Sequence, residues 1–242
     1  MDPRDLAERQ WCEYAVPNFL PSLRANIVLA LSQRFGMSQR QIAKRLGLSQ
    51  AAVSHYSTYR RGSQTPLRAH PGLSKYAKKL AGRIAGGLSG PRLTAAICGI
   101  CTSFRQDEGV EPCFCLYAGV SKPDFLASLG DGIGFPRQPC ETFVVRRLLP
   151  FIRSDVAHHL SGKRGQKKVA SALGVSQPAI SHYVASKRGE DPTLDSIPDL
   201  KEGVEDLAGK LEEGLSSEGR KNAICQLCVD SRKRGLGRVR SE

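Results

Sequence analysis

The sequence predicts an all-α protein made of two helical domains of the same kind. The chain has 242 residues, which is long enough for two modest domains, each with its own core. Hydrophobic residues make up 40% of it and aromatic residues only 6%, which suits compact helical domains better than a β-sandwich. The segment AVSHY at 52–56 also returns as AISHY at 179–183, and such a repeat indicates a duplicated unit.

The match between the two copies extends well beyond these five residues. When the chain is aligned with itself so that 52–56 matches 179–183, IAKRLGLSQAAVSHY (42–56) pairs with VASALGVSQPAISHY (169–183). In the same alignment the CxxC at 98–101 pairs with the CxxC at 225–228. Upstream, after short insertions, Leu20 to Arg24 match Leu149 to Arg153, and Cys12-Glu13 match Cys140-Glu141. We therefore predict a first repeat at 1–115, a Gly- and Pro-rich linker at 116–138, a second repeat at 139–231 and a basic tail at 232–242.

Each repeat contains the pattern of a helix-turn-helix. In the first copy, Ser38 is placed to cap a helix over 39–46, and Gly47 supplies the left-handed residue that ends it. Ser49 then caps a second helix, which Val53 and Tyr56 are expected to hold against the first. The small residue needed where the helices cross is Ala43. The second copy has the matching residues Ala170, Gly174, Ser176, Ile180 and Tyr183.

This pattern resembles the Cro and lambda-repressor (XRE) class of DNA-binding domains, over roughly 20–63 and 149–190. The resemblance implies that the second helix lies in the major groove and that its N-terminal residues contact base edges. These residues are Gln50, Ala51, Ser54 and His55, with Ser49 near a phosphate, and Gln177, Pro178, Ser181 and His182, with Ser176. Arg60, Arg61, Lys187 and Arg188 follow the helices and are expected on backbone phosphates. For both histidines the alternative is a surface position with no role.

The charge distribution favours a polyanionic partner. The formal net charge is +13, and no Asp or Glu occurs between Tyr14 and Gln106. Positive charge that the chain itself does not neutralise is relieved by phosphate, although a generally basic composition is the alternative reading. The second repeat differs, because it carries Asp199, Glu202, Glu205, Asp206, Glu212 and Glu213. We expect the first repeat to contribute more non-specific affinity and the second to dock against a partner or against the first.

Eight cysteines form the other chemical signal. Six recur with the repeat, namely Cys12, Cys98 and Cys101, and Cys140, Cys225 and Cys228, whereas Cys113 and Cys115 occur only in the first copy. CxxC spacing lets two thiolates bind one metal ion or cluster, so we predict an iron-sulfur cluster or zinc. A redox-active pair and inert buried thiols stay open as alternatives. Structural disulfides are not expected in a chain predicted to stay inside the cell.

The order of these features resembles a family of small predicted transcriptional regulators typical of archaea, whose members carry one such unit. The resemblance implies a sequence-specific, duplex-DNA-binding regulator and no enzyme. The duplicated chain is expected to act as a monomer with two pseudo-two-fold repeats, or as a homodimer. No apolar run suits a membrane, and the charged start of the chain lacks a signal core, so a cytoplasmic location is predicted. The alternative function is a protein-interaction or antitoxin-like module, or a non-specific nucleic-acid-binding protein.

Overall fold

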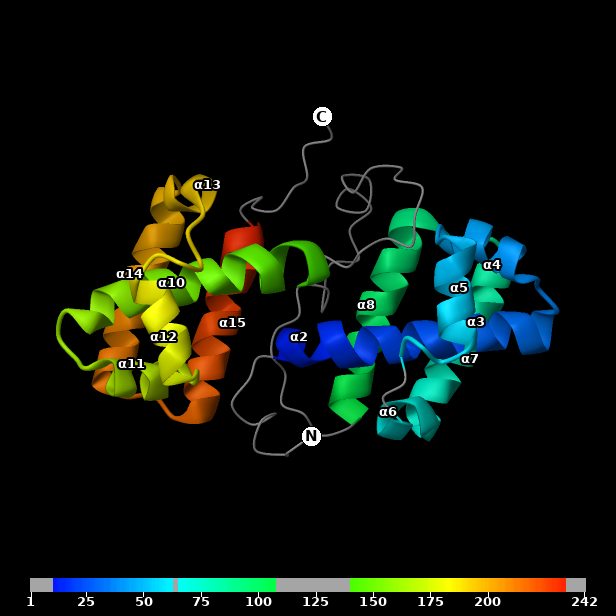
Figure 1. The fold of residues 1–242 in the computed structure, drawn as a ribbon, viewed down its shortest axis with the longest axis horizontal. Coiled ribbons are helices and arrows are strands. Elements are labelled where there is room, and N and C mark those ends of the chain that lie inside the picture. The colour runs from blue at the N-terminus through cyan, green and yellow to red at the C-terminus, as the bar shows by residue number, and fades with distance from the viewer. Residues whose placement is uncertain (1–10, 63–64, 108–139, 234–242) are drawn as a thin grey trace. The chain divides into compact units, whose positions relative to one another are not determined.

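The computed structural model describes residues 11–62, 65–107 and 140–233, and every regular element in these ranges is a helix (Figure 1). The predicted all-α class is therefore confirmed for the described part of the chain. None of the described helices combines the length and the apolar character needed to cross a membrane.

The chain divides into two compact units. Among the described residues, unit N holds 14–62 and 65–107, and unit C holds 140–233 together with 11–13. The boundary near residue 139 falls where the sequence predicts the second repeat to begin. The membership of residues 11–13 was not predicted, because the sequence assigned them to the first repeat. The predicted linker at 116–138 and most of the basic tail lie outside the described residues.

Unit N is built around the long helix α3 (Leu20–Phe35), which follows α2 (Trp11–Tyr14) and the π-helix η1 (Ala15–Phe19). The helix ends at Gly36, which has the left-handed conformation that favours glycine (φ 60°). The other helices of the unit are α4 (Gln39–Leu46), α5 (Gln50–Ser57), α6 (Thr65–Ala69), α7 (Pro71–Ala85) and α8 (Gly90–Asp107). Leu23, Ile27 and Leu31 of α3 are fully buried, since α4, α5 and α7 all pack against this helix.

Unit C has the same order of helices. It starts with η2 (Cys140–Leu148) and α10 (Leu149–Ser161), and continues with α11 (Gln166–Leu173), α12 (Gln177–Val184), α13 (Pro192–Asp195), α14 (Pro198–Glu213) and α15 (Ser217–Lys233). Its core gathers Ile152, Val156 and Leu160 of α10 with apolar residues of α11, α12, α14 and α15. The partly buried side chain of Cys12 packs against this core.

The helices recur at the spacing of the sequence repeat. The first residues of α11, α12, α13, α14 and α15 follow those of α4, α5, α6, α7 and α8 by the same offset that relates the two SHY segments. The local details differ in places. Ser38 and Gln41 form a complete capping box at the start of α4, whereas α11 begins after Gly165 without a side-chain cap.

A buried ion pair holds residue 13 in unit C. The guanidinium of Arg153 donates two hydrogen bonds to the carboxylate of Glu13, at 2.6 and 2.8 Å. The Arg153 side chain is only 7% exposed and that of Glu13 20%. Burial alone would lower the pKa of Arg153, but the hydrogen bonds and the charge of Glu13 raise it above its ordinary value, so Arg153 keeps its positive charge.

Candidate nucleic-acid interface

Two pairs of short helices, α4 with α5 and α11 with α12, carry the residues that the sequence singles out. Each pair is joined by a glycine in the left-handed conformation, Gly47 at φ 57° and Gly174 at φ 65°. The next residue closes the turn, because the N–H of Leu48 donates to the carbonyl of Ala43 and that of Val175 donates to the carbonyl of Ala170. The two pairs are therefore connected by the same backbone turn, as the glycine positions predict.

The inner face of each second helix is apolar and buried. Val53 and Tyr56 of α5 are 0% and 5% exposed, and the corresponding Ile180 and Tyr183 of α12 are 0% and 1% exposed. Ala43 and Ala170, the small residues predicted at the crossing of the helices, are also buried. Both tyrosines thus belong to the core, as expected, and are not available to stack on bases.

The N-termini of the second helices are capped by serine. The hydroxyl of Ser49 accepts a hydrogen bond from the N–H of Ala52 (3.1 Å), and the hydroxyl of Ser176 accepts one from the N–H of Ala179 (3.4 Å). Each hydroxyl keeps its own hydrogen for donation to an outside acceptor. Pro178 lies in the first turn of α12, where its missing N–H costs no helical bond.

The residues predicted to contact bases lie at the surface. Gln50 and Ala51 are exposed, and Ser54 and His55 are partly exposed. In the second copy Gln177, Pro178, Ser181 and His182 are all exposed, as is Ser176. The structure therefore places none of these predicted contacts in a core, and it collects each set on one short helix.

The basic residues that follow α5 and α12 lie in turns with an unusual backbone conformation. Tyr59 and Ser186 both have positive φ, 60° and 55°, although neither is glycine. The N–H of Arg61 donates to the carbonyl of His55, and the N–H of Lys187 donates to that of His182, so each turn folds back on its helix. Arg60, Arg61, Lys187 and Arg188 are all exposed.

Two glycines attach these turns to the long helices. A Cβ at Gly62 would lie 2.4 Å from the carbonyl oxygen of Pro21, and a Cβ at Gly189 would lie 2.4 Å from that of Pro150. Only glycine allows such a close approach of two backbones. The basic turns are therefore held at fixed positions on α3 and α10.

Two arginines near the site were not found from the sequence. Arg68 places its guanidinium 3.2 Å from the centre of the Tyr59 ring, which stacks a cation on the turn that follows α5. Arg220 is buried, donates to the carbonyl of Ser171 (3.0 Å), and lies where a Cβ on Gly174 would stand. Neither contact has a sequence signal, since each arginine comes from a different helix than the residue it meets.

The surface charge differs between the units. The helix α7 of unit N carries the exposed bases Lys75, Lys78, Lys79 and Arg83, and no acid. The corresponding helix α14 of unit C carries the exposed acids Asp199, Glu202, Glu205, Asp206 and Glu213. The exposed charges of α7 are thus all positive, whereas on α14 the exposed acids outnumber the exposed bases Lys201 and Lys210.

The described cysteines of the predicted sets belong to both units. Cys98 and Cys101 are buried thiols in α8 of unit N, whereas Cys12 packs in unit C. Among the side chains that the structure describes, no three Cys, His, Asp or Glu residues come together as metal ligands. Cys113 and Cys115, and the side chain of Cys140, lie outside that description. An iron-sulfur or zinc site thus stays a prediction.

One expectation about the cysteines is wrong. Cys225 is disulfide-bonded, although structural disulfides were not expected, while Cys228 of the same CxxC is a buried thiol. A sulfur in a disulfide has no thiolate lone pair to give to a metal ion, so in this state Cys225 is not a ligand.

Comparisons of the chain with protein-family models, with curated proteins and with solved structures give no match.

Proposed function

We propose that the protein binds duplex DNA as a transcriptional regulator, with α4–α5 and α11–α12 acting as two helix-turn-helix units of homologous domains. In this proposal α5 and α12 enter the major groove and read bases through Gln50, Ser54 and His55 and their counterparts Gln177, Ser181 and His182. The exposed bases after each helix hold the phosphates.

The observation that carries the proposal is the recurrence of one complete surface. Both helix pairs share the glycine turn, the serine cap, the buried tyrosine and the exposed polar N-terminus. Both also share a basic turn that glycine fixes against a long helix. Packing explains the inner residues of this pattern but not the outer ones, which are polar or basic and make no core. A role in recognition accounts for their repetition.

The charge distribution supports a phosphate-bearing partner and ranks the two units. Unit N has exposed bases on α4, on the turn that follows α5 and on α7, and the chain has no acid between residues 14 and 106. Each phosphate contact releases counterions and makes binding weaker at higher salt. We expect unit N to supply most of the salt-dependent affinity, and both units to supply base preference.

The direct test is a selection of bound sequences from random duplex, followed by titration of the selected duplex, random duplex and RNA at several salt concentrations. A regulator should prefer the selected duplex by about 10³-fold or more over random duplex. Equal binding to all three would support a non-specific nucleic-acid-binding protein. Binding to none of them at low salt would support a protein-interaction or antitoxin-like module and contradict the proposal.

Two variants separate base reading from phosphate contact. Gln50→Ala should cost about 1–3 kcal/mol on the selected duplex and little on random duplex. Arg61→Ala should weaken binding to all duplexes equally and lower the salt slope by about one. Gln33→Ala, which changes an exposed glutamine at the end of α3, is the matched control and should alter neither property. Identical behaviour of the first two variants would refute the assignment of their roles.

A further inference from the structure

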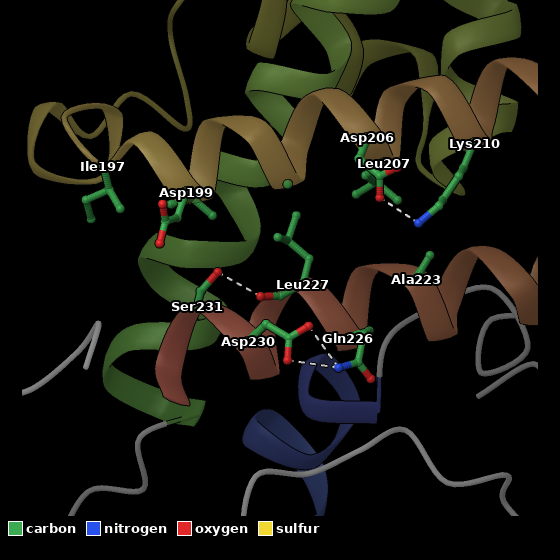
Figure 2. A pocket seen from close by; sticks show the side chains of 12 residues that line it. Ile197, Asp199, Asp206, Leu207, Lys210, Ala223, Gln226, Leu227, Asp230 and Ser231 are labelled. Atoms are coloured by element: carbon green, nitrogen blue, oxygen red, sulfur yellow. Dashed lines mark hydrogen bonds and ion pairs between the residues drawn. The ribbon is translucent and has the colours of Figure 1, made fainter. Parts of the chain in front are cut away.

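An open groove lies between α14 and α15 of unit C. Its cavity has a volume of about 380 Å³, and its apolar lining consists of Ile197, Leu200, Leu207, Ala223 and Leu227. Figure 2 shows side chains of the two helices facing each other across it, with Asp199 and Asp206 on α14 and Asp230 on α15. The lining thus combines apolar side chains with three carboxylates and a single ammonium group, that of Lys210. Lys210 forms an ion pair with Asp206, and Asp230 accepts hydrogen bonds from the amide of Gln226 (Figure 2).

Unit N has a buried aromatic ring near the corresponding place. At the offset of the repeat, Ser231 corresponds to Phe104, and Gly203 corresponds to Tyr76. Phe104 is 3% exposed, and its ring centre lies 5.0 Å from that of Phe19 and 5.1 Å from that of His70. In unit C a methyl of Leu227 takes part of this space, 2.5 Å from where a Cβ on Gly203 would stand. The rest of the space is the groove.

The acids of the groove also differ from the residues at the corresponding positions of unit N. Asp199, Asp206 and Asp230 correspond to Gly72, Lys79 and Ser103 of unit N. The acidic surface continues outward along α14 through the exposed Glu202, Glu205 and Glu213. Unit C thus has no aromatic residue at these aligned positions, and it carries acids at positions where unit N has neutral or basic residues. A protein surface complementary to this groove carries an apolar side chain surrounded by cationic side chains.

Unit N displays such a surface. Phe35, at the end of α3, is 43% exposed, which makes it one of two large hydrophobic residues exposed in the described part of the chain. Its Cζ lies 3.6 Å from where a Cβ on Gly82 of α7 would stand, so the ring lies over the backbone of α7. Lys78 and Lys79, both exposed, precede Gly82 by one helical turn and share its face.

We propose that two copies of this chain associate through these two surfaces. Phe35 of one copy occupies the α14–α15 groove of the other, and Lys78 and Lys79 of α7 lie against the carboxylates of α14. The groove thereby receives from outside the aromatic ring that unit N supplies internally. The proposal does not depend on base reading, because the two surfaces lie on α3, α7, α14 and α15, and not on α5 or α12. The bases of α7 also belong to the proposed phosphate-binding surface, so the test is made without nucleic acid.

The two surfaces are different and lie on different units, so one contact between two copies is heterologous. Such contacts either close, as in a dimer in which each copy fills the groove of the other, or continue into open chains, according to the rotation between the copies. The charged part of the contact is exposed and therefore screened by salt.

Sedimentation velocity of the full chain over a range of protein and salt concentrations is the experiment. At low salt the mean sedimentation coefficient should rise with protein concentration above that of the monomer, and added salt should reduce the rise. Phe35→Ser should weaken association about tenfold, because a central ring is lost from a small contact. The exposed position of Phe35 allows this change without disturbing the core, and circular dichroism checks that the fold is kept.

Charge reversal provides a complementation test. Lys79→Glu disables the basic surface and keeps the groove, whereas Asp206→Lys disables the groove and keeps the basic surface. Each variant alone should associate at least about tenfold more weakly, because like charges then face each other. Their mixture retains one intact contact, so it should form a 1:1 dimer that grows no further. Lys44→Glu and Glu190→Lys change the net charge equally at exposed positions on neither surface and should self-associate like the original chain.

Three results would overturn the proposal. The first is a chain that sediments as a monomer at every concentration up to about 100 µM in low salt. Such a result includes the case in which the two surfaces meet within one chain. The second is self-association that Phe35→Ser, Lys79→Glu and Asp206→Lys all leave unchanged. The third is a mixture of the two charge variants that shows no heterodimer although each variant is folded.

Discussion

The ion pair between Glu13 and Arg153 gives the sharpest stability prediction. Replacing Glu13 with Gln keeps the size of the side chain but removes the negative charge. The Arg153 side chain, only 7% exposed, then retains a positive charge with no carboxylate beside it. Breaking a buried pair in this way costs about 3–5 kcal/mol, and the partial exposure of Glu13 favours the lower end of this range. For a unit of this size, the lower end of this range corresponds to a fall in melting temperature of roughly 12–24 °C.

The structure also predicts an asymmetry and a rescue. Arg153→Met should cost less than Glu13→Gln, because Glu13 is 20% exposed and water can solvate the carboxylate that remains. The double variant Glu13→Leu, Arg153→Met should regain most of the stability, since two apolar side chains then occupy the site without a buried charge.

The assay is unfolding followed by calorimetry and by the fluorescence of Trp11, the single tryptophan of the chain. The loss should affect the transition of unit C. Glu213→Gln, at an exposed position at the end of α14, is the control and should change stability by less than about 0.5 kcal/mol. The reasoning would be refuted if Glu13→Gln behaved like this control, because residues 11–13 would then contribute nothing to unit C.

Four further substitutions test other parts of the structure by thermal unfolding. Gly62→Ala should destabilise unit N by more than roughly 2 kcal/mol, because φ is 74° there and a Cβ would meet the carbonyl of Pro21. Gly36→Ala should cost only about 1–2 kcal/mol, because φ is 60° but no atom lies within 4 Å of the added Cβ. Equal losses would mean that the contact with Pro21 is unimportant. Ser38→Ala should cost about 1 kcal/mol through loss of the cap of α4, and no loss would contradict the capping box. Asp155→Asn should stabilise unit C at pH 7, because burial raises the pKa of Asp155 above its ordinary 3.8 and so disfavours the ionised acid in the folded state. This gain should disappear as the pH falls below 3.8, and a gain that persists there would exclude ionisation as its cause.

Much of the local structure could be predicted because it depends on residues close together in the sequence. Ser38, Ser49 and Ser176 cap helices through bonds to residues three positions later, and Gly47 and Gly174 are the residues that tolerate the left-handed turn. Helical spacing likewise separates the buried Val53 and Tyr56 from the exposed Ala51. The positive φ of Tyr59 and Ser186 was not predictable, because neither residue type favours it; the fold imposes it on the turn.

The contacts between distant residues depended on the tertiary structure. The sequence places Cys12 and Glu13 in the first repeat, yet the buried charge of Arg153 binds the Glu13 carboxylate in unit C. The guanidinium of Arg220 meets the turn at Gly174 from another helix.

By itself the sequence determined that the chain is helical, that its pattern occurs twice at a constant offset, and which polar and basic residues accompany each pair of short helices. These properties follow from hydrophobic spacing, caps and glycine positions, which act within a few residues. Only the tertiary structure decided which unit the N-terminal residues join, and that the α14–α15 groove is open where Phe104 closes its counterpart. Both depend on which side chains fill a space or neutralise a charge after folding, and a spacing along the chain does not specify that.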